Sequence, residues 1–347
     1  MPMDFLTGSK QEFDTFIKSI KKEDKIAVLT HTDLDGIASA VFLSEILKIN
    51  NLKIKIIKFL QYKSGLIKSI LSELLSNDIT KLFILDFNCD ADENGIEDFE
   101  ELRKNIPTFL IDHHPSSPNL KDKRNILKTK SEDCTALTVY NLGKEYFRKE
   151  KYIELVCSAM ITDFSFTNKN NLEFIKEYYP DFNENYLKSS IGKKADLLSL
   201  ALIYFRSKLI HPYKLILNNK IEDLEKYSKF VKKEVDKILD DFEKNKESYP
   251  NKNIYIYYFE NSFGILSYIS TELSIKYPNK TIIIISPREK GFLGISGRNQ
   301  TGDVDISNLI KKGISGLNNA TAGGHKKASG GSIQKQDLDK FKENILG

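Results

Sequence analysis

Histidine and aspartate side chains that can bind metal ions gather in four short segments of this sequence. The whole chain has only five histidines, and two of them are adjacent. Carboxylates and imidazoles without any thiolate suit Mn²⁺ or Mg²⁺ better than they suit a structural zinc site. The seven candidate ligands are His31, Asp33, Asp35, Asp86, His113, His114 and Asp163.

This number of candidate ligands indicates two metal ions, because one ion needs about three or four protein ligands. Two ions joined by a bridging carboxylate lie about 3.5–4 Å apart, lower the pKa of a bound water and stabilise both oxygens of a phosphodiester displacement. Asp86, which stands alone after an apolar run, is the predicted bridge. His114 is predicted to face the substrate or to support a ligand. The predicted chemistry is hydrolysis of a phosphodiester.

Three of the four segments directly follow apolar runs that predict buried strands, at residues 25–30, 81–85 and 108–111. Helical patterns separate these runs, the first of them from Ile37 to Ile49. The alternation predicts an α/β fold with a doubly wound parallel sheet. In such sheets ligands bind beyond the carboxyl ends of the strands. Aspartate is also a common turn residue, so a single ending of this kind would mean little. Three such endings, two of them with histidine, favour a functional site.

The fourth segment follows a helix. Residues 152–161 are almost entirely apolar and predict a buried helix that ends shortly before Asp163. An aspartate at this place has two interpretations: it is the solvated end of the helix, or it reaches the cluster of the other candidates.

The C-terminal part carries a second set of candidates. Arg298 follows a predicted strand and can pair bidentately with a phosphate, although a surface salt bridge is the alternative. A glycine-rich segment at residues 323–331 is predicted to be a loop whose backbone can approach and bind an anion. The predicted substrate-binding residues are Arg298, Gly323, Gly324, His325 and Gly330.

A length of 347 residues predicts more than one domain. We expect the sheet domain with the metal site in residues 1–215, a connecting helix in 216–250, and a smaller α/β substrate-binding domain in 251–347. No apolar run approaches the roughly 20 residues of a membrane span, and the N-terminus lacks the layout of a signal peptide. The sequence therefore predicts a cytoplasmic protein without membrane contact. The net charge of +4 permits a nucleic-acid partner without arguing for one.

The order of these motifs resembles the DHH phosphoesterase superfamily. The matching motifs are His31-x-Asp33-x-Asp35-Gly36, Asp86, Asp112-His113-His114, Asp163 and, for the accompanying C-terminal domain, Gly323-Gly324-His325-x-x-Ala328-Ser329-Gly330. The first motif extends to Ser39 and is closer to the RecJ-like and archaeal branch. Ile37 stands where bacterial oligoribonucleases of the superfamily usually carry a further aspartate.

The resemblance implies two Mn²⁺ ions, with Mg²⁺ as the alternative, and a cleft in which the C-terminal domain grips nucleic acid. The implied metal ligands are His31, Asp33, Asp35, Asp86, His113 and Asp163. The implied catalytic residues are Asp112 and His114. The implied substrate binders are Arg298, His325 and the neighbouring glycines.

Three functions remain open at this point. The first is an Mn²⁺-dependent exonuclease that hydrolyses single-stranded DNA or RNA by a two-metal mechanism. The second is an oligoribonuclease-type hydrolase of very short oligonucleotides or cyclic dinucleotides. The third is an inactive scaffold associated with replication, as among relatives that have lost metal ligands. The expected partners are single-stranded DNA or RNA or short oligonucleotides, and a homodimer is compatible with the sequence.

Overall fold

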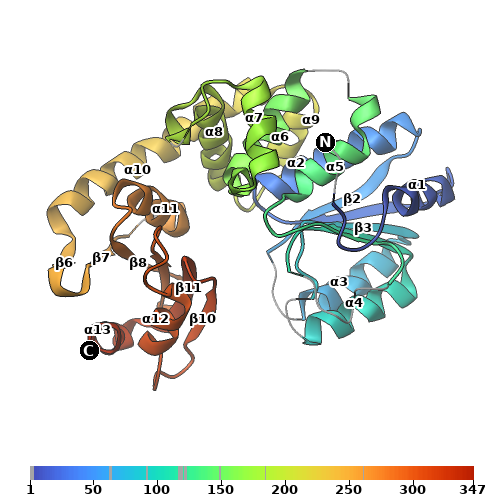
Figure 1. The fold of residues 1–347 in the computed structure, drawn as a ribbon. Helices are drawn as coiled ribbons and strands as arrows, with labels where there is room; N and C mark the ends of the chain where they lie inside the picture. The colour runs from blue at the N-terminus through green and yellow to red at the C-terminus, as the bar shows by residue number, and fades with distance from the viewer. Residues whose placement is uncertain are drawn as a thin grey trace. The chain divides into compact units, whose positions relative to one another are not determined.

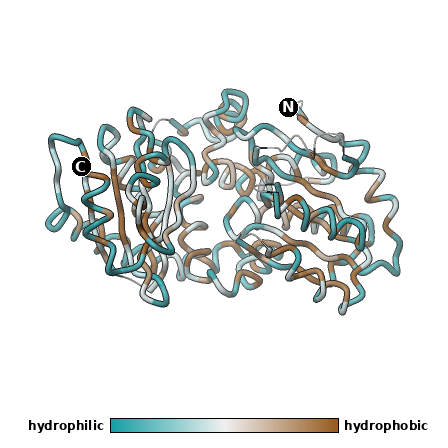
Figure 2. The backbone as a smooth tube through the Cα atoms, turned by 90° about the horizontal axis from the view of Figure 1, so that it is seen from below, coloured by the Kyte–Doolittle hydropathy of each residue, from teal (hydrophilic) through white to brown (hydrophobic). Residues whose placement is uncertain are grey.

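The structure is a computed structural model, and it describes residues 4–61, 65–90, 93–115, 120, 123–147, 150–183, 185–260 and 262–347. The chain divides into two compact units, Met1–Ser228 and Lys229–Gly347 (Figure 1). Within each unit, hydrophobic residues run along the interior strands (Figure 2). Among the residues described, no helix combines the length and the apolar character that crossing a bilayer requires.

The first unit is built on a parallel sheet. Its five strands are β1 (Ile26–Thr30), β2 (Ile54–Phe59), β3 (Lys81–Leu85), β4 (Thr108–Asp112) and β5 (Ile126–Lys128). All neighbours pair in parallel, in the order β2-β1-β3-β4-β5. Every residue of β1, β4 and β5 is buried, because a parallel sheet is covered on both faces. The strand order reverses at β1, which confirms the predicted doubly wound sheet. In such sheets ligands bind at the point of reversal, here the carboxyl ends of β1 and β3.

Helices cover both faces of this sheet (Figure 1). The helices of the first unit are α1 (Lys10–Ser19), α2 (Leu34–Ile49), α3 (Leu66–Ser76), α4 (Glu93–Asn105), α5 (Thr135–Leu142), α6 (Glu150–Thr162), α7 (Lys169–Tyr178), α8 (Ser190–Phe205) and α9 (Ile210–Leu217). On one face, Ile84 of β3 shares a core with Phe99 of α4. On the other face, Phe16 of α1 contacts the rings of Phe83 and Phe109, with centroids 5.3 Å apart in both pairs. These two cores fix the strands whose ends carry the candidate ligands.

The second unit is a smaller α/β domain, as predicted. Its elements are α10 (Glu225–Asn245), which begins in the first unit, β6 (Glu247–Tyr249), β7 (Ile254–Tyr258), α11 (Leu266–Lys276), β8 (Thr281–Pro287), β9 (Phe292–Arg298), α12 (Ile306–Gly313), β10 (Thr321–Gly324), β11 (Ala328–Gln334) and α13 (Leu338–Leu346). The six strands form one sheet in the order β10-β11-β9-β8-β7-β6, in which β7 and β8 are parallel and the other neighbours antiparallel.

The prediction of a glycine-rich loop at residues 323–331 is wrong. Most of this segment is a β-hairpin, in which Gly323 pairs with Gly330 and Gly324 with Ser329. Glycine usually weakens a strand. Here β11 pairs on both edges, with β10 and along all of β9, so the ladder hydrogen bonds outweigh the poor propensity. Only the turn around His325 lies outside the strands.

The predicted start of α2 is also wrong. The pattern places it at Ile37, whereas the helix begins at Leu34 with Asp33 as its N-cap. The cap side chain accepts a hydrogen bond from the backbone N–H of Gly36, which is a strong helix start signal. As a result, Asp35 lies in the first turn of the helix rather than in the preceding loop.

Candidate metal centre

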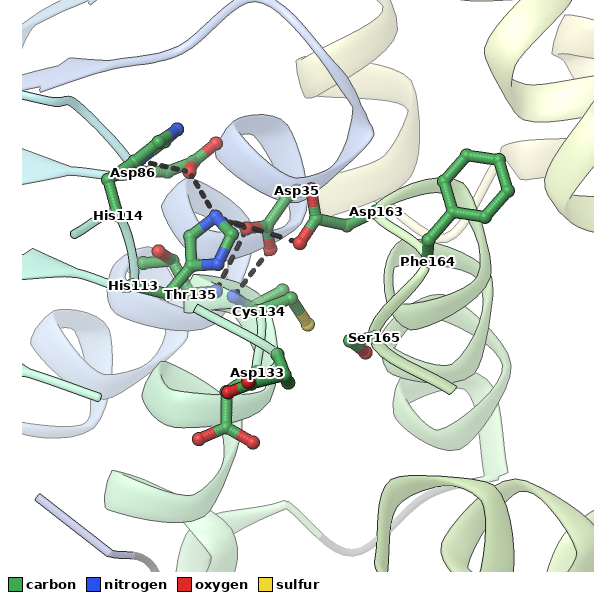
Figure 3. A network of polar contacts seen from close by, with 12 residues as sticks. Asp35, Asp86, His113, His114, Asp133, Cys134, Thr135, Asp163, Phe164 and Ser165 are labelled. Atoms are coloured by element: carbon green, nitrogen blue, oxygen red, sulfur yellow. Dashed lines mark hydrogen bonds and ion pairs between the residues drawn. The ribbon is translucent and has the colours of Figure 1, made fainter. Parts of the chain in front are cut away.

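The carboxyl ends of β1, β3 and β4 and the end of α6 bring the seven candidate ligands together. Figure 3 shows Asp35, Asp86, His113, His114 and Asp163 of this set. Among the residues described, their ligand atoms form three groups, each within 4.8 Å. The groups are His31, Asp33 and Asp86; Asp86, His113 and His114; and Asp35, His113 and Asp163. Asp86 belongs to two groups and so does His113, so the three groups make one connected centre.

The turn from β1 into α2 places His31 and Asp33. One carboxylate oxygen of Asp33 accepts from Gly36 N–H at 3.0 Å, and the other lies 2.7 Å from Nδ1 of His31. Gly36 allows this compact turn, because a Cβ there would stand 2.5 Å from the carbonyl oxygen of His31. The glycine of the first motif therefore has a packing role.

The N-terminus of α5 holds Asp35. Its carboxylate is 1% exposed and accepts hydrogen bonds from the backbone N–H groups of Thr135 at 2.8 Å and Ala136 at 2.6 Å. A helix N-terminus stabilises negative charge. The sequence reasoning missed this contact, because backbone N–H groups leave no residue-type signal.

Asp86 lies where β3 ends, with a left-handed φ of 49° that is uncommon outside glycine. Its N–H bonds the carbonyl of Ile111 on β4 at 2.9 Å, which fixes this turn. The side chain is 2% exposed. One oxygen lies 3.5 Å from Nε2 of His113, and the other lies 3.7 Å from Nδ1 of His31. Strained backbone of this kind clusters at functional sites, and here it directs one carboxylate at two imidazoles.

His113 stands between three carboxylates (Figure 3). Its Nε2 lies 3.9 Å from Asp35, 3.5 Å from Asp86 and 3.6 Å from Asp163. These distances exceed ordinary hydrogen bonds. They suit atoms that share a cation, since ligands about 2.1 Å from one ion stand about 3 Å or more apart. Asp163, which follows α6, therefore reaches the cluster rather than only ending the helix.

Several buried polar atoms of this centre make no hydrogen bond with the residues described. They are Oδ2 of Asp86, Nδ1 of His113 and Oδ2 of Asp163. Buried polar groups normally have partners, and an exception needs a reason such as a bound ion. The atoms present, carboxylate oxygens and imidazole nitrogens, fit Mn²⁺ or Mg²⁺.

The electrostatics of the centre point the same way. Burial, together with repulsion from Asp35 and Asp33, raises the pKa of Asp86 well above its ordinary value. Burial also raises the pKa of Asp163 well above its ordinary value. Burial lowers the pKa of His31, but the attraction of Asp33 and the other carboxylates outweighs it and raises that pKa to about 9. Bound cations would offset this concentration of negative charge.

Asp112 takes a different position from the other acids. It belongs to none of the three ligand groups, and its side chain is fully buried. One of its oxygens lies 2.8 Å from Nδ1 of His114, so the residue orients that imidazole. Its second oxygen lies 2.9 Å from Nζ of Lys128, which also contacts Asp90. The sequence reasoning missed both of these last residues, because a short buried strand carries the lysine.

The C-terminal candidates lie together within the second unit. Arg298 ends β9 and pairs in register with Ala328, the first residue of β11, so it lies beside the hairpin turn. Its guanidinium donates to the hydroxyls of Ser270 and Ser267, both at 3.2 Å. The structure thus places an oriented arginine next to the glycine-rich hairpin that carries Gly323, Gly324, His325 and Gly330.

Two family models match this chain. One, described as the DHH family, N-terminal domain, matches residues 25–162, and the other, the DHHA1 domain, matches residues 251–346. The chain belongs to the DHH superfamily. The first match contains six of the seven candidate ligands of this DHH chain, and the second contains Arg298 and the hairpin. No match is found among curated protein sequences.

Solved structures share the fold of this DHH chain. RecJ from Thermus thermophilus in complex with Mn²⁺ has a TM-score of 0.69 and 12% identity, covering 99% of this chain and 54% of RecJ. A DHH domain from a member of the s1p family of ribosomal proteins has a TM-score of 0.67 and 15% identity, covering 99% of this chain and 93% of that domain. Cdc45 from Entamoeba histolytica has a TM-score of 0.58 and 11% identity, covering 97% of both chains. The chain thus spans about half the length of that RecJ, and these identities show the shared fold alone.

Proposed function

We propose that this chain is an Mn²⁺-dependent phosphodiesterase that degrades single-stranded DNA or RNA as an exonuclease. The observation that carries the proposal is the sharing of Asp86 and His113 among three groups of ligand atoms. Two ions bridged by a carboxylate need such overlap, and two-metal sites are common in phosphodiester hydrolysis. The shared fold with a RecJ that binds Mn²⁺ supports this choice of metal and substrate class.

In this proposal one ion is bound by His31, Asp33 and Asp86, and the other by Asp35, Asp86, His113 and Asp163. When bound, the ions supply charge stabilisation and a hydroxide at neutral pH. The chain holds the ligands in place before binding. The N-terminus of α5 fixes Asp35, and the left-handed turn fixes Asp86.

His114 has the properties of a residue that contacts the substrate. Its Nδ1 bonds Asp112 at 2.8 Å, and its side chain is 33% exposed. An imidazole with one nitrogen fixed by a carboxylate has the other free to move a proton or to bond a phosphate oxygen. We assign this role to Nε2 of His114.

The proposed roles of the three parts of the chain are those that the sequence predicts. Residues 1–215 carry the hydrolytic centre, residues 216–250 connect the two domains, and residues 251–347 bind the substrate. Arg298 is held by two serine hydroxyls, so its guanidinium is oriented for pairing with a phosphate. The exposed hairpin turn at His325 is the proposed contact for the sugar or a further phosphate.

A time course on end-labelled single-stranded DNA and RNA of about twenty nucleotides tests the proposal, with a dinucleotide in parallel and Mn²⁺ or EDTA added. An exonuclease produces a ladder from one end with Mn²⁺ and nothing with EDTA. Cleavage of the dinucleotide alone would replace this proposal with a hydrolase of very short oligonucleotides. Bound Mn²⁺ without cleavage of any substrate would favour the scaffold.

A further inference from the structure

A fully buried lysine lies next to the candidate metal centre. Lys128 is the last residue of β5 and is 0% exposed. Its strand pairs in parallel with β4, and the register sets Lys128 opposite Asp112. Lysine is almost never fully buried unless it is paired, so its partners define what it does.

Two buried carboxylates surround the ammonium of Lys128. Its Nζ lies 2.7 Å from Asp90 and 2.9 Å from Asp112, and all three side chains are 0% exposed. The ammonium also donates to the backbone carbonyl of His114 at 3.3 Å. Buried ion pairs are often no more stabilising than apolar residues of the same volume. Stability alone therefore gives little reason for this trio.

The trio continues to the partly exposed imidazole of His114. Asp112 uses one oxygen for Lys128 and the other for Nδ1 of His114, at 2.8 Å. Because one oxygen forms an ion pair and the other a hydrogen bond, the carboxylate is held on both sides and its plane is fixed. A carboxylate in a fixed plane selects the tautomer with the proton on Nδ1 and sets the direction of the ring. Lys128 also contacts the backbone of His114, so it fixes both ends of that residue.

We propose that Lys128, anchored by Asp90, is a positioning residue that fixes the ring direction and tautomer of His114 through Asp112. The inference deepens the proposed function and rests on it for the role of His114 in hydrolysis. The ammonium contacts none of the carboxylates of the three ligand groups among the residues described. Its loss should therefore act through His114 and leave the remaining ligands in place.

The first test observes His114 without any need for hydrolysis. Long-range proton–nitrogen NMR of the full chain with Mg²⁺, which is diamagnetic, reports the tautomer of each histidine, and comparison with His114→Gln assigns the signals. The wild type is expected to show one Nδ1-protonated form. Lys128→Met, which keeps an unbranched side chain one atom shorter and removes its charge, is expected to show a mixture of tautomers. An unchanged His114 signal in this variant overturns the proposal.

The second test is kinetic. Loss of a supporting partner typically lowers activity by about 10–100-fold, and Lys128→Met is expected to lower kcat within this range while KM changes by less than about twofold. Lys128→Arg, which keeps a cation, should retain more of kcat. Asp90→Asn should lower kcat less, since Lys128 keeps Asp112. Asp90→Asn also tests the proposal if Lys128→Met does not fold. An unchanged kcat together with an unchanged His114 signal in Asp90→Asn overturns the anchoring of Lys128 by Asp90.

Ile126→Ala is the matched control. Ile126 is buried on the same strand but belongs to the apolar core, and its side chain has no polar atom with which to contact the trio. If this control, at equal loss of stability, lowers kcat and changes the His114 signal as much as Lys128→Met does, the effect is structural and the proposal fails. If the wild type hydrolyses nothing, the proposed function fails, while the NMR comparison still decides whether Lys128 positions His114.

Discussion

The two candidate sites of this molecule are built in opposite ways. The metal centre draws carboxylates and imidazoles, most of them buried or half-buried, from the ends of β1, β3, β4 and α6. The Arg298 site lies on the neighbouring antiparallel strands β9, β11 and β10, and its hairpin residues Gly323, Gly324 and His325 are exposed. The first site concentrates like charge away from water, whereas the second presents one oriented cation and accessible backbone.

The difference teaches what each site requires from the rest of the fold. Buried like charges need supporting contacts, and the structure supplies them through the α5 N-terminus for Asp35 and through Lys128 for Asp112. Among the described residues, strand register and two serine hydroxyls support the Arg298 site. Changes in the metal centre should therefore alter chemistry strongly, and changes in the Arg298 site should alter binding moderately.

The largest effect is expected from Asp86→Asn. This change removes the carboxylate common to two ligand groups, so kcat should fall by more than the roughly 100-fold that loss of a supporting residue costs. Mn²⁺ should stabilise the wild type against thermal unfolding by about 2.7 kcal/mol at a concentration of 100 times Kd. This stabilisation should be smaller in the variant. Asp223→Asn, an exposed acid in the turn before α10, is the control. Activity of Asp86→Asn within about twofold of the wild type would refute the assignment.

Gly36→Ala should destabilise the protein. The new Cβ would stand 2.5 Å from the carbonyl oxygen of His31, so β1 and α2 must shift, at a cost of about 1–3 kcal/mol. Gly323→Ala tests the same change in the other site, where a Cβ has nothing within 4 Å. Urea unfolding measures both variants. Equal loss of stability in the two would contradict the contrast between the sites.

Arg298→Ala should raise KM about tenfold, which corresponds to about 1.4 kcal/mol of lost binding, and should change kcat less. The physical reason is loss of a bidentate partner for phosphate outside the reacting centre. Arg298→Lys should recover part of the loss, because the charge remains without the fork. Lys312→Ala, an exposed site with the same change in charge, is the control. A fall in kcat with unchanged KM would place Arg298 in the chemistry instead.

The smallest effect is expected at Glu243, which belongs to an exposed network of charged side chains in the second unit. Although burial opposes it, hydrogen bonds from Lys246, Lys276 and Tyr277 lower the pKa of Glu243 to about 2. Because the folded pKa is below the ordinary 4.5, this contribution is present above pH 4.5 and is lost as pH falls toward 2. Solvent screening keeps it below about 1 kcal/mol. Glu243→Gln should flatten this part of the pH dependence of Tm; a wild-type curve in the variant would contradict it.

Much of the metal centre was predictable because strands end where their apolar runs end. The runs before His31, Asp86 and His113 were visible in the sequence, and a parallel sheet brings such ends together. The contacts that support the centre were not predictable. Lys128 meets Asp112 only through the pairing of β5, a strand of three residues, with β4.

In the second unit, the local sequence led to a wrong prediction of secondary structure. The glycines of residues 323–331 indicated a loop, because local propensity argues against strands there. Long-range pairing with β9, far along the chain, decided the structure instead. In the first unit, the Asp33 N-cap likewise makes α2 begin at Leu34, about one turn before the start of its apolar pattern.

Anomalous diffraction from crystals of the full chain soaked in Mn²⁺ tests the central claim most directly. The account predicts two peaks about 3.5–4 Å apart, with Asp86 between them, His31 and Asp33 at one ion, and His113 and Asp163 at the other. Loss of both peaks or of one peak in Asp86→Asn would agree with a shared ligand. A single peak away from Asp86, or none at Mn²⁺ concentrations that support activity, would contradict the two-metal centre.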